Sequence, residues 1–115
     1  MEKQDRRREE RIQCVLGVEE VNDQPVEGTY LLDIASFGAQ METNFIMAVG
    51  DSVKLSIAIP ATKPEDRIVY HLSGQVVWIK EGKSAPERHR IGLSFFTPYR
   101  ETAQILEHFR YKLLL

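Results

Sequence analysis

The sequence predicts a mostly β protein, an antiparallel barrel or sandwich with one C-terminal α-helix packed on it. Three observations support this fold class: about six short β-rich segments at fairly regular spacing, turn signals between them, and a C-terminal segment with helical periodicity. The chain has 115 residues, of which 43% are hydrophobic and 28% charged. These values are typical of one soluble domain with a single modest core.

Two β-rich segments show apolar alternation with period two. They contain Ile12, Cys14, Leu16 and Val18, and Val53, Leu55, Ile57 and Ile59. The other segments expected to form strands are Thr29–Asp33, Gly38–Thr43, Ile68–Lys80 and His89–Phe96. Turn-forming residues separate them at positions 22–25, 50–51, 61–66 and 81–83.

The segment Ile68–Lys80 is expected to be apolar on both faces, with Val76 and Trp78 on one side and Val77 and Ile79 on the other. Its outer face therefore needs a cover. The C-terminal segment is the candidate, because Thr97 can cap a helix, Pro98 suits its first position, and apolar residues recur with helical spacing. We expect this helix to run from Pro98 to about Leu113.

Charge and composition exclude several function classes. The formal net charge of −2 disfavours a general nucleic-acid binder, so any basic function must be local. Cys14 is the only cysteine, which leaves no intramolecular disulfide, and we interpret it as a small hydrophobe rather than a reactive thiol. No stretch is apolar enough for a signal peptide or a membrane span, so the expected compartment is the cytosol, without membrane insertion.

Catalytic motifs are also missing from the sequence. No serine has nucleophile-elbow glycines, no two histidines have metal-site spacing, and no glycine-rich loop matches a nucleotide triphosphate cradle. We therefore expect no enzyme, no metal and no cofactor.

An arginine cluster precedes the first strand. In the stretch "RREER", Arg7 and Arg11 are four residues apart, so an extended arm presents both on one side. Guanidinium groups bind phosphate through a rigid fork of donors and stack on purines. The alternative is a solvated charged tail. We expect this arm to be mobile until an anionic ligand neutralises it.

A second stretch, "DIASFG", lies between two expected strands. Its aspartate, Asp33, could accept two N–H donors from the Watson–Crick edge of a guanine, while Gly38 could give the connection a positive φ angle. The alternative for Asp33 is a turn-forming aspartate that satisfies its own backbone.

These two motifs resemble those of the PilZ domains, bacterial receptors for cyclic di-GMP, which carry RxxxR and then (D/N)xSxxG. Here 21 residues separate Arg11 from Asp33, and "SGQVVWIKEG" and "RHRIGLSFF" look like the late strands of that family. The resemblance covers nearly the whole chain. It implies a single domain over residues 1–115, with an arm over 1–11, a six-stranded antiparallel barrel over 12–96 and a helix over 98–113.

The resemblance also implies roles for individual residues. Arg7 and Arg11 would hold phosphate oxygens and guanine faces, and Asp33 would recognise a guanine edge. Gly38 would allow close approach of the loop, and Arg6 would reach a second guanine. Trp78 corresponds to an aromatic residue that borders the ligand in some members, or it is a core tryptophan.

One position departs from the family pattern. Ala35 stands where the motif has serine, with Ser36 one place later. Losing one neutral hydrogen bond costs about 0.5–1.5 kcal/mol, so we expect weaker binding rather than none.

The function implied by the resemblance is a cytoplasmic cyclic di-GMP receptor and adaptor. It would order its arm on ligand binding and signal to a separate output protein in motility, biofilm or exopolysaccharide control. One alternative is a degenerate PilZ-like module that works through protein contacts alone. A third alternative is nonspecific binding of RNA or of another single-stranded nucleic acid, which the net negative charge of the chain disfavours.

Overall fold

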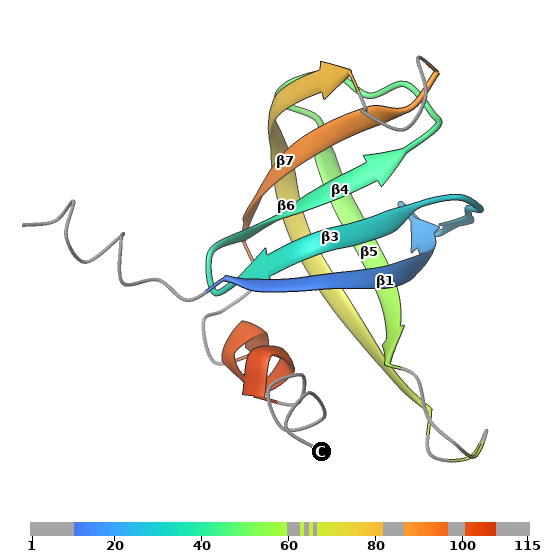
Figure 1. Ribbon diagram of the computed structural model, residues 1–115, viewed down its shortest axis with the longest axis vertical. Coiled ribbons are helices and arrows are strands. Elements are labelled where there is room, and N and C mark those ends of the chain that lie inside the picture. Colours follow the sequence, from blue (N-terminus) through green and yellow to red (C-terminus); the bar gives the residue numbers. More distant parts are fainter. Residues whose placement is uncertain are drawn as a thin grey trace, which may run out of the picture.

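The computed structural model describes residues 11–59, 63, 65, 67–81, 87–96 and 101–107, without the side chain of Ile59. Its strands are β1 (Ile12–Val21), β2 (Gln24–Pro25), β3 (Tyr30–Ala35), β4 (Gly38–Thr43), β5 (Ser52–Ile59), β6 (Ile68–Glu81) and β7 (His89–Phe95). Six of them follow the order β1–β3–β4–β7–β6–β5, and β5 pairs again with β1. All pairings are antiparallel, so the chain forms the predicted six-stranded barrel (Figure 1).

The short strand β2 forms a hairpin on the end of β1. Its two-residue turn contains Asn22 and Asp23, with φ angles of 53° and 66°, the left-handed values that such hairpins require. The side chain of Asn22 ties this turn to β5, because its Oδ1 accepts a hydrogen bond of 2.8 Å from the Lys54 backbone. The predicted turn at residues 22–25 is confirmed for residues 22 and 23, whereas Gln24 and Pro25 belong to β2.

β-Bulges in β1 and β6 change which side chains of these strands face the core. In β1, shifts of register after Gln13 and after Val18 let one strand pair with β3 along its first half and with β5 along its second. In β6, a shift between Val76 and Trp78 interrupts the alternation. The prediction that Val76 and Trp78 share a face is therefore wrong, since Val76 lies in the core with Ile79 packed against it and Trp78 lies outside the core cluster.

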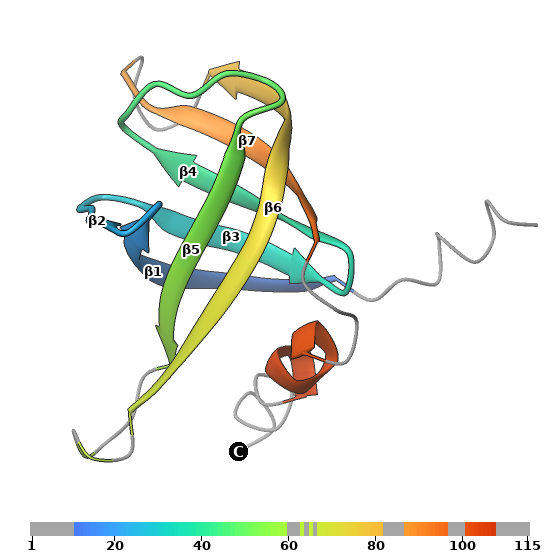
Figure 2. The same cartoon turned by 180° about the vertical axis from the view of Figure 1, so that it is seen from behind.

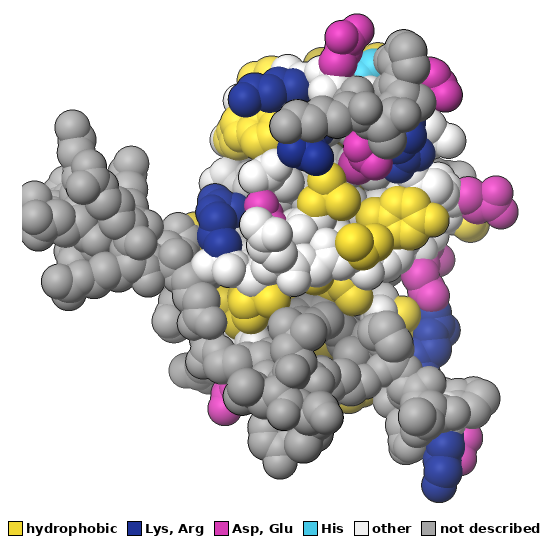
Figure 3. Space-filling view, in the orientation of Figure 1, with side chains coloured by type: hydrophobic (Ala, Val, Ile, Leu, Met, Phe, Trp, Pro, Cys, Tyr) yellow, Lys and Arg dark blue, Asp and Glu magenta, His cyan; other side chains and the backbone are white. Residues whose placement is uncertain are grey.

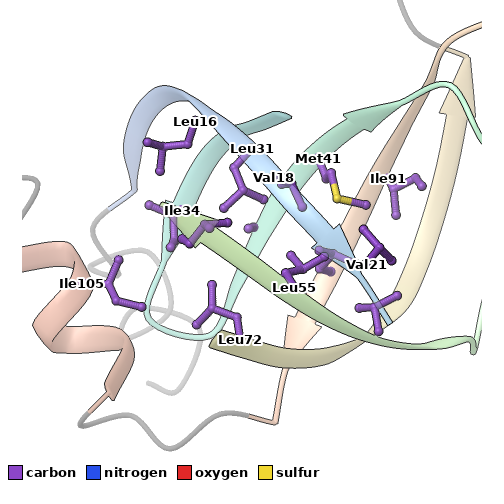
Figure 4. Packing of buried hydrophobic residues seen from close by; sticks show 14 of the residues in the cluster. Leu16, Val18, Val21, Leu31, Ile34, Met41, Leu55, Leu72, Ile91 and Ile105 are labelled. Atoms are coloured by element: carbon purple, nitrogen blue, oxygen red, sulfur yellow. The ribbon is translucent and has the colours of Figure 1, made fainter. Parts of the chain in front are cut away.

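The core fills the barrel and continues into the C-terminal helix. Figure 4 shows Leu31, Met41, Leu55 and Ile91 pointing into the barrel, and Ile105 reaching it from the helix. The described part of this helix spans residues 101–107. Ile105 and Leu106, at 1% and 4% exposure, bury their side chains almost completely, which stabilises this contact by about 1.5–3 kcal/mol each.

The position of the helix corrects one expectation. It closes one end of the barrel (Figures 1 and 2) and does not cover the outer face of β6, where Val77 remains 42% exposed. The expected cap at Thr97, the start at Pro98 and the last turn to Leu113 lie outside the described residues. Within those residues, no helix has the length and apolar character needed to cross a membrane.

Candidate ligand site

An ion pair joins the arginine that precedes β1 to the aspartate of β3. The Nη1 of Arg11 donates to Oδ1 of Asp33 over 2.9 Å. The Arg11 side chain is 51% exposed, whereas that of Asp33 is 12% exposed. Cross-strand pairing of Ile12 with Ile34 produces this contact, because it brings the start of β1 beside the end of β3.

Asp33 is held from its other side by β4. The backbone N–H of Gln40 donates to the same Oδ1 over 3.2 Å. No described residue donates to Oδ2. The interpretation of Asp33 as an aspartate that satisfies its own turn is wrong, because its partners are Arg11, just before β1, and Gln40 in β4.

The turn after Asp33 contains Ser36 and Phe37 and leads directly into Gly38. Among the described glycines, Gly28 and Gly50 have positive φ and Gly38 does not, so the expected left-handed conformation of Gly38 is wrong. Its small size matters for packing instead. A Cβ at Gly38 would lie 2.3 Å from the Leu93 carbonyl oxygen, so β4 and β7 could not approach as they do.

Ala35 shares the outer face with Asp33. Between them, Ile34 points into the core, and Ala35 is fully buried without belonging to the core cluster. Ser36 lies in the turn, half-buried, and the structure shows no hydrogen bond from it to Asp33. The hydroxyl of the family motif therefore has no replacement on Asp33 among the described residues.

The outer face carries a row of residues across five strands. In register they are Gln13, Asp33, Gln40, Gly92 and Trp78. The ring of Trp78 lies over Gly92, because a Cβ there would come within 2.2 Å of the indole. Trp78 is thus a half-buried surface tryptophan, and the core interpretation of it is wrong. This arrangement joins a carboxylate, an arginine and an aromatic face on one side of the barrel.

The sequence profile of the PilZ domain matches residues 5–112. The chain belongs to the PilZ domain family. A search of curated proteins gives no significant match. PilZ domains are binding and adaptor modules and form a family of cyclic di-GMP receptors.

The PilZ structure brings together some of the predicted site residues. Arg11 and Asp33 are in contact, and Trp78 lies in the same outer row as Asp33. Gly38 lies at the start of β4, next to the turn that follows Asp33. Arg6 and Arg7 fall outside the described residues.

Sequence reasoning missed Gln40 and Gly92. A signal for Gln40 was present, because a two-residue turn at Ser36 and Phe37 pairs Ala35 with Gly38 and therefore Asp33 with Gln40. No such signal existed for Gly92, since its contact with Trp78 depends on the bulge in β6.

Cys14 lies close to this site but on the inner side of β1. Burial, and then the negative charge of Asp33, raise the pKa of its thiol from 9.0 to about 11. The Sγ atom lies 3.8 Å from the Leu31 carbonyl oxygen. A thiol that stays protonated is a poor nucleophile, in agreement with its interpretation as a small hydrophobe. No group of three or more His, Cys, Asp or Glu side chains within the described ranges could hold a metal ion.

Proposed function

We propose that this PilZ domain is a receptor for cyclic di-GMP, with Arg11, Asp33 and Trp78 on the ligand and Gly38 beside it. The observation that carries the proposal is the Arg11–Asp33 pair on the outer face, in which Asp33 keeps Oδ2 for an outside donor. Arg6 and Arg7 belong to the same proposal through their position in the family motif.

The chemistry of the pair fits a guanine nucleotide. A carboxylate oxygen accepts hydrogen bonds from the N1 and the exocyclic amine of guanine, and a guanidinium binds a phosphate oxygen. Arg11 occupies Oδ1 together with the Gln40 backbone. A guanine that uses both carboxylate oxygens would therefore displace Arg11, which would turn toward the phosphate.

Signal output is the second part of the proposal. The domain would act as an adaptor on a separate output protein, in motility, biofilm or exopolysaccharide control, from the cytoplasm. Two aromatic side chains lie beside the site: Phe37 is 62% exposed and Phe96 is 59% exposed. Their segments are linked by a hydrogen bond of 2.8 Å from the Phe95 N–H to the Phe37 carbonyl oxygen. An arm ordered by the ligand would change the surface around them.

An Arg11→Ala variant tests the receptor proposal, with Arg67→Ala as the matched control. Both arginine side chains are about half exposed and form an ion pair, but Arg67 pairs with the exposed Glu19, away from the outer row. We expect Arg11→Ala to weaken cyclic di-GMP binding by roughly tenfold or more, since a hydrogen bond to a charged group contributes about 1.5–3 kcal/mol. The melting temperature of Arg67→Ala should change little, because exposed pairs contribute about 0–1 kcal/mol. That of Arg11→Ala should fall somewhat more, because the largely buried Asp33 carboxylate loses its cation.

Titration calorimetry and a thermal melt measure both quantities. Equal affinities for the two variants would contradict the assignment of Arg11 to the ligand. Unfolding of Arg11→Ala alone would mean that this arginine is a structural residue.

A second candidate function is a PilZ module that no longer binds nucleotide, and Ala35 is the observation that favours it. Its fully buried methyl group offers no hydrogen bond where the family motif has a hydroxyl. The absence of cyclic di-GMP binding by the wild-type chain in the same titration would select this candidate.

A further inference from the structure

Two glutamines flank Asp33 on the outer face of the barrel, and neither belongs to the family motifs. The strand register places Gln13 of β1 and Gln40 of β4 directly opposite Asp33, one on each side. Their chain neighbours Ile12 and Met41 belong to the core cluster, so alternation turns both glutamines outward. Residues directly opposite on neighbouring strands have Cβ atoms about 4.5–5.5 Å apart. The outer face therefore carries an amide, a carboxylate and an amide in one row.

The side-chain amides of this row are not used by the described fold. Gln40 contacts Asp33 through its backbone, whose N–H donates to Oδ1 over 3.2 Å. Within the described part of the chain, no hydrogen bond holds the carboxamide of Gln13 or of Gln40. Gln13 is exposed and Gln40 is half-buried. Figure 3 shows charged side chains at separate places on the face formed by β3, β4 and β7, with uncharged surface between them.

The row matches the order of polar atoms on a guanine. Guanine presents N1–H and an exocyclic amine, which a carboxylate can accept, and the acceptors O6 and N3 lie on either side of these two donors. An amide N–H on each side of the Asp33 carboxylate would meet these acceptors. Adenine has an acceptor at N1, which would face the carboxylate without a proton between them. The row therefore favours guanine over adenine.

The position of Arg11 sets the direction of such a base. Arg11 and Gln13 are two residues apart, and both lie on the β1 side of Asp33. Under the proposed function Arg11 binds a phosphate group, which is joined to guanine through the ribose, on the side of the base that carries N3. N3 would therefore face Gln13 on β1, and O6 would face Gln40 on β4.

We propose that Gln13 and Gln40 complete the recognition of guanine, with the amide N–H of Gln13 donating to N3 and that of Gln40 donating to O6. The inference rests on the proposed function and adds two residues that select the base. These two hydrogen bonds would offset the hydroxyl that is missing at Ala35.

The test removes each donor by a substitution of similar size. Gln13→Leu and Gln40→Leu are titrated calorimetrically with cyclic di-GMP, with Gln24→Leu as the matched control. Gln24 is an exposed strand glutamine in β2, paired with the far end of β1. The first two variants should each bind roughly three- to tenfold more weakly, the loss expected for one neutral hydrogen bond, and the control should bind like the wild type.

A thermal melt checks the fold of each variant. Because Gln40 is half-buried, Gln40→Leu is the variant more exposed to a folding defect, and the exposed Gln13 keeps the test valid if Gln40→Leu unfolds.

A modified ligand tests the contact of Gln13 itself. In the 3-deaza analogue of cyclic di-GMP, C–H replaces N3 of each guanine, which removes this acceptor and keeps N1–H, the amine and O6. The wild type and Gln24→Leu should bind the analogue roughly three- to tenfold more weakly than cyclic di-GMP. Gln13→Leu should bind the two ligands equally, because the hydrogen bond is already lost.

The outcomes separate this inference from the receptor proposal. Cyclic di-GMP binding that neither glutamine substitution weakens would overturn the inference and leave the receptor proposal standing. A Gln13→Leu variant that still loses affinity when N3 is replaced would overturn the contact between Gln13 and N3. A wild-type chain that does not bind cyclic di-GMP would contradict the receptor proposal, and the inference with it.

Discussion

Asp33 has one carboxylate oxygen engaged by the fold and one without a donor among the described residues. Oδ1 accepts from Arg11 and from the Gln40 backbone, while Oδ2 has no donor among the described residues. An amide at this position keeps a carbonyl oxygen that can accept from guanine, and the family motif allows asparagine there. Under the proposed function, the number of acceptor oxygens at this position therefore sets the strength of guanine binding.

This distinction predicts different results for two substitutions of Asp33. Asp33→Asn keeps one acceptor oxygen and loses the other, so it should weaken cyclic di-GMP binding by roughly tenfold or more, since a hydrogen bond to a charged group contributes about 1.5–3 kcal/mol. Asp33→Ala removes the acceptor altogether and should lose considerably more. Titration calorimetry of both variants measures the difference, and equal losses would contradict recognition of guanine through this oxygen.

Cys14 gives a prediction about pH. Burial and the charge of Asp33 raise the pKa of its thiol to about 11, so the thiolate is rare at neutral pH. Its reaction with iodoacetamide at pH 8 should be far slower than that of free cysteine, whose pKa is about 8.5, and should accelerate toward pH 11.

The same shift affects folding stability. The unfolded chain loses the thiol proton near pH 9 and the folded chain near pH 11, so this contribution is complete below pH 9 and is lost between the two values. Rapid alkylation of the folded chain at pH 8 would contradict the described environment of the thiol.

At the scale of the elements, contact between β4 and β7 depends on a glycine. A Cβ at Gly38 would lie 2.3 Å from the Leu93 carbonyl oxygen, whereas nothing lies within 4 Å of the equivalent position at Gly17. Gly38→Ala should therefore destabilise the fold by about 1–3 kcal/mol, and Gly17→Ala should change it by less than about 1 kcal/mol.

Urea denaturation of both variants measures this difference. Equal stability would contradict the close approach of the two strands. Because Gly38 acts through packing, its loss should weaken ligand binding only through distortion of β4 and the turn before it.

The strands also show how far the sequence predicted the molecule. Apolar alternation in two segments, and β-rich composition between turn signals in the other four, predicted the six long strands, and the two motifs contain Arg11 and Asp33, which are in contact. The face of Trp78 could not be predicted, because a single bulge between Val76 and Trp78 reverses every side chain after it. The helix was expected from its periodicity, but its place at the barrel end depends on packing that periodicity does not define.

For the molecule as a whole, the net charge of −2 opposes an anionic ligand, while the cations of the outer face favour it. The charges close to the ligand determine whether an anion binds, because charges farther apart than about 10 Å are largely screened at 0.1 M salt. Binding of an anionic ligand to this PilZ domain would therefore depend on a few basic side chains on one side of the barrel, although the protein as a whole is not basic.

The most direct test is titration calorimetry of the wild-type chain with cyclic di-GMP, with GTP as the control at the same salt concentration. The account predicts saturable binding of cyclic di-GMP at micromolar or lower concentration, and none of comparable strength for GTP. The absence of any heat with cyclic di-GMP, together with an unchanged melting temperature, would contradict the receptor function.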